Sequence, residues 1–327
     1  MKPASASPLI HVVAASPAAL GGAELHALQL VRLLATHAAT HLWATNPSAP
    51  RIDEVPIRTI HPFRGEFPRG GTLIILGNFF SIGDWVHHTG CRRVIVVCNL
   101  SDPARLFRLL RQLDHPKLPD PELAFVTDRL RLTLGLPGRV IISPVDTDLF
   151  RPGPVRETNG FCVGRHSRDT PDKHHPDDPS LYRMLTFAGC KVRVMGGTCL
   201  AASLARDAAG IELLPEESGA ASEFLRSLDC FFYRTAPSWS ETGGRVILEA
   251  LSSGLPVVAH AAGGYTDWIE NGRNGYIFES QEEAFDLVMR LRKDAALRQS
   301  MAAAARQSAL ELSGADALKP MLDWYLA

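Results

Sequence analysis

Short apolar runs alternate with helical patterns along the whole chain. In the first half these runs are LIHVVAAS, THLWAT, TLIILGN, RRVIVVCN, LAFVT and RVIISPV, and the longest helical pattern between them is AELHALQLVRLLATHA. Apolar residues fill each run continuously instead of occupying every second position, as expected for strands buried on both faces. The pattern predicts a parallel sheet covered by helices.

The same pattern restarts after a segment that resembles a linker. Residues 151–160, RPGPVRETNG, contain two prolines, two glycines and several charges, a composition typical of linkers. Beyond them the apolar runs are GFCVGRHS, CKVRVMGG, GIELLP, LDCFFYR, LPVVAHA and GYIF. We therefore predict an α/β protein of two domains, each a Rossmann-like, doubly wound sheet.

Composition is compatible with this picture and excludes several classes of protein. The 327 residues suit two domains of common size. With 46% hydrophobic and 21% charged residues the chain is not of the disordered or fibrous type, and a net charge of −1 gives no global attraction to nucleic acid. The six cysteines form no C-x-x-C pair, which indicates reduced thiols packed in the core of a cytoplasmic protein.

No strong targeting signal is visible in the sequence. The start, MKPASASPLIHVVAAS, is too polar and its apolar run too short for a signal peptide, and no stretch reaches the roughly 18 apolar residues of a membrane span. Any contact with a membrane is therefore expected to be peripheral.

Glycines and basic residues follow the predicted strands. Gly21 and Gly22 come after the first strand and open a helix, while Arg165 and Lys173 follow the first strand of the second half, and Gly197 ends another. Ligands of doubly wound sheets bind beyond the carboxyl ends of the strands, and helix N-termini attract anions. A plain turn at the glycine pair and ordinary surface charges at the two basic residues are the alternatives.

Residues 238–264, SWSETGGRVILEALSSGLPVVAHAAGG, carry the most informative chemistry. The apolar spacing predicts a helix from about Gly244 to Ser253, with Glu241 in the loop before it and Glu249 inside it. The amides of Gly243 and Gly244 can bind a phosphate, and the two carboxylates can accept hydrogen bonds from hydroxyls on either side. The simpler alternative is a solvated helix face with a capping charge.

This stretch resembles the E-x7-E region of the retaining GT-B glycosyltransferases of family four, the type that acts in bacterial glycan and polysaccharide biosynthesis. The resemblance extends to ENGRNGYIF, VGRHSRDTPDK, VDTDLF and GGAELHALQLVRLLA. It implies the GT-B fold, in which two Rossmann-like domains with parallel sheets face each other across a cleft. The expected parts are an acceptor-side domain at 1–150, a nucleotide-sugar domain at 151–310, and a helix at 311–327 that crosses back to the first domain, where Trp324 and Tyr325 are expected to pack.

The resemblance also implies roles for individual residues. Glu241 would hold hydroxyls of the donor sugar, and Arg165 and Lys173 would bind its diphosphate, which makes these three the expected catalytic residues. Glu249 would bind the ribose of the nucleotide. The full set expected to bind the donor is Gly21, Gly22, Gly164, Gly197, Thr242, Gly243, Gly244 and Glu249.

The expected reaction needs no cofactor and no metal, because basic residues and a helix N-terminus neutralise the leaving diphosphate. The co-substrate would be a nucleotide-diphosphate sugar of the UDP or GDP type. The loop KHHPDDPS contains His174, His175, Asp177 and Asp178, but its prolines and close spacing favour a solvated loop over a metal site.

One position departs from the family pattern. Where the family often has a histidine after a strand of the first domain, this chain has Asn99, which can hydrogen-bond a sugar or an acceptor but cannot carry a proton. Two alternatives to a glycosyltransferase therefore remain: a GT-B epimerase acting on a UDP-sugar, and a non-catalytic nucleotide-sugar sensor.

The acceptor is expected to be a glycan or a lipid-linked molecule. The segment DPARLFRLLRQLDHPK predicts a helix that buries Leu106, Leu109, Leu110 and Leu113 and exposes Arg105, Arg108, Arg111 and Lys117. Such a basic face suits an anionic lipid or the inner membrane surface, although an ordinary amphipathic core helix has the same pattern.

Overall fold

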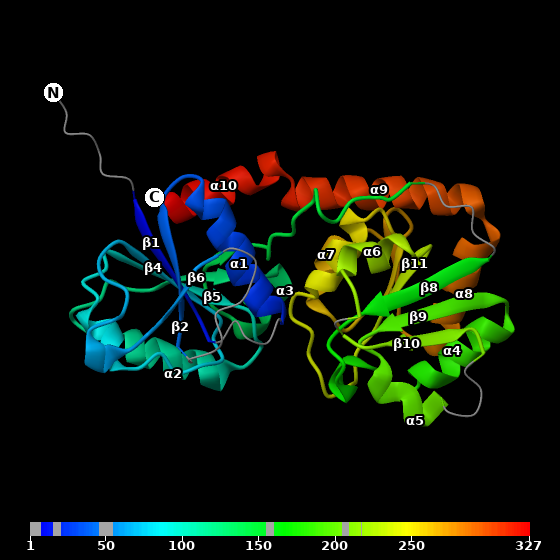
Figure 1. The fold of residues 1–327 in the computed structure, drawn as a ribbon, viewed down its shortest axis with the longest axis horizontal. Coiled ribbons are helices and arrows are strands. Elements are labelled where there is room, and N and C mark those ends of the chain that lie inside the picture. Colours follow the sequence, from blue (N-terminus) through cyan, green and yellow to red (C-terminus); the bar gives the residue numbers. More distant parts are fainter. Residues whose placement is uncertain (1–7, 16–20, 46–54, 155–159, 205–208, 217) are drawn as a thin grey trace. The chain divides into compact units, whose positions relative to one another are not determined.

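The computed structural model describes residues 8–15, 21–45, 55–154, 160–204, 209–216 and 218–327 (Figure 1). The chain forms two compact units. Unit 1 consists of Met1–Pro144 together with Leu318–Ala327, and unit 2 of Val145–Ala317.

Unit 1 contains a seven-stranded parallel sheet with the strand order β3-β2-β1-β4-β5-β6-β7. Its central strands are continuous runs of buried apolar residues, as in Val94–Cys98, which explains their position between two layers of helices. The strands are β1 Leu9–Ala14, β2 Ala39–Ala44, β3 Ile57–Thr59, β4 Thr72–Leu76, β5 Arg93–Cys98, β6 Glu122–Phe125 and β7 Arg139–Val140.

The helices of unit 1 include one from the far end of the sequence. They are α1 Gly22–Ala35, α2 Pro103–Leu113, α3 Asp128–Leu134 and α10 Ala315–Leu326, with 3-10 turns η1 Pro62–Arg64 and η2 Asp84–His88. Within α10, Leu322 and Tyr325 belong to the hydrophobic core of unit 1. Arg93 donates a 2.5 Å hydrogen bond to the carbonyl of Trp324, and its guanidinium lies 4.8 Å from the centre of that indole. The last helix therefore completes the core of the first unit.

Unit 2 contains a six-stranded parallel sheet with the order β10-β9-β8-β11-β12-β13. Its strands are β8 Phe161–His166, β9 Cys190–Met195, β10 Ile211–Leu214, β11 Cys230–Tyr233, β12 Val257–His260 and β13 Gly275–Phe278. Its helices are α4 Asp178–Phe187, α5 Ala201–Leu204, α6 Ala221–Arg226, α7 Arg245–Ser252, α8 Gln281–Lys293 and α9 Ala295–Ser313, with 3-10 turns η3 Pro171–Lys173, η4 Thr198–Leu200 and η5 Gly264–Trp268.

The chain passes from unit 1 to unit 2 between Pro144 and Val145, before the expected linker. The segment after this point is held on unit 2, because the carbonyl of Phe150 accepts hydrogen bonds from Ser252 at 2.6 Å and from Arg306 at 3.0 Å. Residues 155–159 of the expected linker lie outside the described residues. The hydrogen bonds to Phe150 attach this segment to unit 2, so the division between the units precedes the proline-rich segment.

The cysteines are free thiols, and five of the six are buried. Cys199, in η4, is exposed, so the expectation that all six pack in the core is wrong at this position. No helix in the described part of the chain is long and apolar enough to cross a membrane.

Candidate functional site

Most of the expected site residues lie at or beyond the carboxyl ends of strands in unit 2. Arg165 is near the end of β8, Lys173 ends η3, and Gly197 follows β9. Glu241 lies in the loop between β11 and α7, and Glu249 lies within α7. Because parallel strands end at one edge of the sheet, residues far apart in sequence, such as Lys173 and Glu241 at a separation of 68 positions, are brought into contact there.

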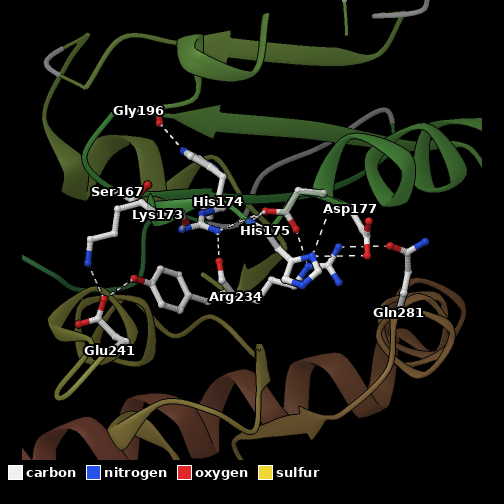
Figure 2. A network of polar contacts seen from close by, with 12 residues as sticks. Ser167, Lys173, His174, His175, Asp177, Gly196, Arg234, Glu241 and Gln281 are labelled. Atoms are coloured by element: carbon white, nitrogen blue, oxygen red, sulfur yellow. Dashed lines mark hydrogen bonds and ion pairs between the residues drawn. The ribbon is translucent and has the colours of Figure 1, made fainter. Parts of the chain in front are cut away.

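Lys173 and Glu241 form the central ion pair of this edge, as Figure 2 shows. The ammonium Nζ of Lys173 lies 2.6 Å from Oε2 of Glu241, and the hydroxyl of Tyr233 donates to the same oxygen at 2.9 Å. The amide of Gly244 donates to Oε1 at 3.3 Å. The two charged side chains keep 11% and 14% of their surface exposed, so the pair remains open to a ligand.

The surroundings keep Glu241 ionised. Burial alone raises the pKa of this carboxyl, but the charge and hydrogen bond of Lys173, together with Tyr233 and the amide of Gly244, lower it below its ordinary value. Burial and the neighbouring carboxylate raise the pKa of Tyr233, so its hydroxyl stays protonated and acts as a donor. The site thus offers a carboxylate that can accept hydrogen bonds from neutral hydroxyls.

Trp239 forms one wall beside this pair. Its ring centre lies 4.4 Å from Nζ of Lys173 and 5.4 Å from the guanidinium carbon of Arg168. A cation held over an indole face gains electrostatic stabilisation. The aromatic ring therefore limits the positions that the Lys173 ammonium can take.

Arg165 does not present its charge as expected. Its side chain is fully buried, with Nη1 donating to the carbonyl of Arg234 at 2.5 Å and Nη2 to the carbonyl of Lys173 at 2.6 Å. Its guanidinium also lies 4.5 Å from the ring centre of Tyr233. The structure thus places Arg165 behind the ion pair, where it anchors the backbone of Lys173 and the ring of Tyr233 and does not face a ligand.

The residues of the loop KHHPDDPS are engaged within the protein. His174 contacts the carbonyl of Gly196 through Nε2 at 2.8 Å, and Asp178 pairs with Arg234 at 2.5 Å (Figure 2). Burial, with the charge of Arg165, lowers the pKa of His174 to about 4, so this imidazole is neutral near pH 7. Among the described residues, no group of three or more histidine, cysteine or acidic side chains is arranged to hold a metal ion.

Glu249 forms a second buried cluster with two residues that the sequence analysis missed. Nε of Arg245 lies 2.9 Å from its Oε1, and Nε2 of His166 lies 3.2 Å from its Oε2. Burial raises the pKa of Glu249, but the close contact with His166 and the charge of Arg245 outweigh it and lower the pKa overall. Arg245 and Glu249 are four residues apart in a helix, so their contact could have been predicted from the sequence. The contact with His166 could not, because it forms only after the sheet has folded.

The expected glycines divide into two groups. Gly244 caps α7 in the left-handed conformation, with φ of 61°, and a Cβ there would lie 2.6 Å from the ring of Tyr265. A Cβ on Gly164 would lie 2.3 Å from the carbonyl oxygen of Arg193, and one on Gly197 2.5 Å from a methyl of Val194. Close packing explains the last two glycines, so a contact with the donor is not needed to account for them.

Of the remaining expected residues, Thr242 is half-buried in the loop before α7, next to Gly243. Gly21, Gly22 and Asn99 belong to unit 1. The carbonyl of Gly21 accepts the first hydrogen bond of α1, from Leu25 at 3.1 Å, and Gly22 is exposed.

Asn99 follows β5 in unit 1, and its loop is organised by a residue that the sequence analysis missed. The side chain of Asn78 is buried, and its Oδ1 accepts the amides of Asn99 at 3.3 Å and Leu100 at 3.0 Å. Nδ2 of Asn78 donates a 2.9 Å hydrogen bond to the carbonyl of Leu100. Asn78 thereby fixes the backbone at the carboxyl end of β5.

The part of unit 2 that contains Glu241 and Glu249 is similar to a known protein family. Residues 206–308 match the family described as glycosyl transferases group 1. A 77-residue stretch is 46% identical to the sulfoquinovosyl transferase of Arabidopsis thaliana, and 91 residues are 34% identical to the D-inositol 3-phosphate glycosyltransferase of a Nocardioides strain. These stretches make up 22% and 27% of this chain but only 15% and 20% of the two relatives.

A comparison of structures extends the similarity to almost the entire chain. The crystal structure of Anabaena HepE in complex with UDP-glucose superposes with a TM-score of 0.74, covering 98% of this chain and 99% of that one at 17% sequence identity. Similarity at this low identity reports the fold. Together with the two parallel sheets described above, it shows that the chain has the GT-B fold.

Proposed function

We propose that the protein is a retaining glycosyltransferase that moves a sugar from a UDP- or GDP-sugar to a hydroxyl of a glycan or lipid-linked acceptor. The observation that carries the proposal is the Lys173–Glu241 pair, with the Tyr233 hydroxyl and the Gly244 amide, at the carboxyl edge of unit 2. Glu241 and Glu249 lie within the stretch that matches group 1 glycosyl transferases. The retaining course rests on the resemblance to family four.

Each residue of the pair has a defined role in this proposal. The carboxylate of Glu241 accepts hydrogen bonds from hydroxyls of the donor sugar, because Lys173 and Tyr233 hold it ionised and in place. The ammonium of Lys173 lies beside the departing diphosphate, and its positive charge stabilises the negative charge that develops there in the transition state. Arg165 acts as a positioning residue, since its hydrogen bonds fix the backbone of Lys173.

The chemical step balances without a further reagent. The bond between the sugar carbon and the phosphate oxygen breaks, and a bond from the same carbon to the acceptor oxygen forms on the same face of the sugar. The proton of the acceptor hydroxyl passes to the departing phosphate oxygen, so no protein base is required. Asn99 in place of a histidine is compatible with this course.

A role in cell-surface polysaccharide synthesis at the cytoplasmic side of a membrane is part of the proposal. In α2, Leu106, Leu109 and Leu113 are buried, whereas Phe107 is 53% exposed and Arg108 and Arg111 are exposed beside it. An exposed aromatic ring among arginines suits an anionic bilayer surface that carries a lipid-linked acceptor.

The proposal is tested by product analysis with a panel of UDP- and GDP-sugars. The conservative variants Glu241→Gln and Lys173→Gln should each lower transfer by about tenfold or more, the value of one lost charge-assisted hydrogen bond. Lys191→Gln, an exposed residue of β9, serves as the control. Consumption or epimerisation of the donor with no acceptor-linked product identifies an epimerase, and saturable binding without turnover identifies a sensor.

Metal independence is a separate prediction. We expect a chelator such as EDTA to leave the transfer rate unchanged, because Lys173 and the amides before α7 supply the positive charge at the diphosphate. The measurement is the initial rate with and without chelator, followed by readdition of magnesium or manganese. A rate that falls with chelator and returns with either ion contradicts the prediction.

A further inference from the structure

Unit 1 contains a cavity that the proposed function does not use. Its volume is about 620 Å³, within the range of small-molecule sites, and it is lined by His11, His41, Trp43, Arg58, Phe67 and Arg69, among others. His11, His41, Trp43 and Arg58 come from β1, β2 and β3, and Phe67 and Arg69 come from the loop that follows η1. We call this cavity the unit 1 pocket.

The topology of the sheet explains why the pocket exists. His11 pairs with His41, and Trp43 pairs with Arg58, so these side chains share one face of the sheet. The chain first builds β2 and β3 on one side of β1 and then β4 and β5 on the other side. Because the crossover connections are right-handed, this change of direction places α1 and α2 on opposite faces of the sheet. On the sheet face that carries α2, strands β1 to β3 are covered by a loop and not by a helix.

Buried hydrogen bonds hold the floor of the pocket in place. Nε1 of Trp43 donates to Nδ1 of His11 at 3.1 Å, which leaves Nε2 of His11 to donate to the carbonyl of Arg69 at 3.2 Å. The imidazole of His11 is therefore neutral and links β1, β2 and the loop. Burial lowers the pKa values of both His11 and His41, so neither adds a charge at pH 7.

Two arginines are positioned in the pocket by aromatic rings instead of by carboxylates. The guanidinium carbon of Arg58 lies 5.4 Å from the ring centre of Trp43, and that of Arg69 lies 4.3 Å from the ring centre of Phe67. Within the described ranges neither arginine has a hydrogen bond or ion pair through its side chain. A guanidinium stacked on a ring keeps its N–H groups available at its edge.

The charge balance of the pocket favours an anion. Its lining includes two arginines, Arg58 and Arg69, and one acidic residue, Glu66, so the formal charge of the pocket is positive. Planar guanidinium groups bind phosphate and carboxylate oxygens with paired hydrogen bonds. Preorganised rings behind the arginines reduce the entropy lost when they bind such an oxyanion.

We propose that the unit 1 pocket is a second ligand site, which binds a phosphate group through Arg58 and Arg69. This goes beyond the proposed function, because the pocket lies on a sheet face of unit 1 and includes the first half of β1, whereas the sugar-nucleotide residues lie at the carboxyl edge of unit 2. The phosphate belongs either to a soluble phosphate ester or to a lipid headgroup.

The rim of the pocket makes the lipid source worth testing. Residues 61–66 form a tight turn, in which the amide of His61 donates to the carbonyl of Glu66 at 2.8 Å. Phe63 lies at its tip and is fully exposed, and Arg64 follows it. An aromatic side chain next to a phosphate-binding pocket is the arrangement that would meet a bilayer interface.

Binding of inorganic phosphate by calorimetry tests the site itself. The full chain carrying Lys173→Gln is used throughout, so that the proposed donor site does not contribute, and chloride holds the ionic strength constant. Arg58→Gln and Arg69→Gln should each weaken phosphate binding about tenfold or more. Arg92→Gln, which removes an exposed arginine of the same unit outside the pocket, should leave the affinity unchanged.

The inference is overturned if phosphate does not bind saturably, if both pocket variants bind as tightly as the parent, or if Arg92→Gln weakens binding equally. Because Arg58 and Arg69 are exposed, the variants should fold, and circular dichroism checks this. The assay measures no turnover, so its result is independent of whether the protein transfers a sugar.

Sedimentation with vesicles then distinguishes the two sources of phosphate. Phosphatidylcholine vesicles are compared with and without phosphatidic acid. Binding that requires phosphatidic acid and is lost in Arg58→Gln and Arg69→Gln, but kept in Arg92→Gln, assigns a lipid headgroup. If calorimetry shows phosphate binding but the vesicles do not bind through these arginines, the ligand is a soluble phosphate ester.

Discussion

Glu249 is less exposed than Glu241, although the protein pairs both carboxylates. The side chain of Glu249 is only 4% exposed, and Arg245 and His166 engage both of its oxygens. Its oxygens keep free lone pairs, but so little exposed surface leaves no room for a ribose unless Arg245 or His166 moves aside, whereas Glu241 keeps more exposed surface. The proposed ribose contact therefore depends on a rearrangement of the Arg245–Glu249–His166 cluster.

The variant Glu249→Gln tests this assignment while keeping the shape of the side chain. We expect the affinity for UDP or GDP to fall about tenfold or more, because a charge-assisted hydrogen bond becomes a neutral one. Titration calorimetry measures this, and Glu270→Gln, which removes an exposed carboxylate paired with Arg273, is the matched control. Equal affinity in the Glu249 variant and the wild type would contradict a ribose contact.

His174 makes stability depend on pH. Its pKa is about 4 in the folded protein, against an ordinary value of 6.5, so the unfolded chain takes up its proton first as the pH falls. Stability should therefore decline below about pH 6.5, by roughly 2 kcal/mol at pH 5 at a slope of about 1.4 kcal/mol per pH unit.

Urea unfolding at pH 7 and pH 5 measures the His174 contribution. The variant His174→Gln should lose less stability than the wild type between these two values, and His37→Gln, which changes an exposed histidine of unit 1, should behave as the wild type. The same pH dependence in all three proteins would rule out His174 as the cause.

At the scale of the element, apolar runs predicted the central strands because these are buried on both faces. TLIILGN contains β4, RRVIVVCN contains β5, and the helix expected from Gly244 to Ser253 is α7 at Arg245–Ser252. The edge strands of unit 1 were harder: β3 was not predicted, and the run RVIISPV forms only the two exposed residues of β7. These two strands have one neighbour and little burial, so their sequences lack the apolar pattern.

The candidate site was only partly predictable from the sequence. The residue types and order of 241–249 identified the two glutamates, but the burial of Arg165 and the roles of Tyr233, Trp239 and His166 were not visible. Those contacts join residues of different strands and loops, so their geometry exists only after the sheet has formed. Sequence spacing reveals neighbours within a helix but not across a sheet.

The start of α7 depends on Gly244. Because φ there is 61° and a Cβ would lie 2.6 Å from Tyr265, Gly244→Ala should lower the free energy of unfolding by about 2 kcal/mol or more. Gly90→Ala separates the two causes, since Gly90 has φ of 59° but open space around its Cβ position. Chemical denaturation should give a smaller loss for Gly90→Ala, and equal losses would exclude the contact with Tyr265 as a cause.

At the scale of the whole molecule, α10 makes unit 1 depend on the last residues of the sequence. Tyr325 is fully buried in the core of unit 1, and its hydroxyl has no hydrogen-bond partner within the described part of the chain. We expect Tyr325→Ala to destabilise the protein by about 3–5 kcal/mol, the usual cost of deleting a buried aromatic ring.

Tyr325→Phe is the matched control for the ring. It removes only the unpaired hydroxyl and should leave stability equal or higher. Thermal and urea unfolding followed by circular dichroism compare the two variants. A Tyr325→Ala protein as stable as the wild type would show that α10 does not contribute to the core.

The division of the chain has a consequence for biosynthesis. Unit 2 is one uninterrupted segment, Val145–Ala317, and all of its residues have been made before Leu318–Ala327. Unit 1 begins first but lacks Leu322 and Tyr325 until translation passes them, so its apolar surface near Arg93 stays uncovered while the entire second unit is synthesised. The domain that is translated first is thus the one completed last, and chaperones that protect exposed apolar surface would act on it during that interval.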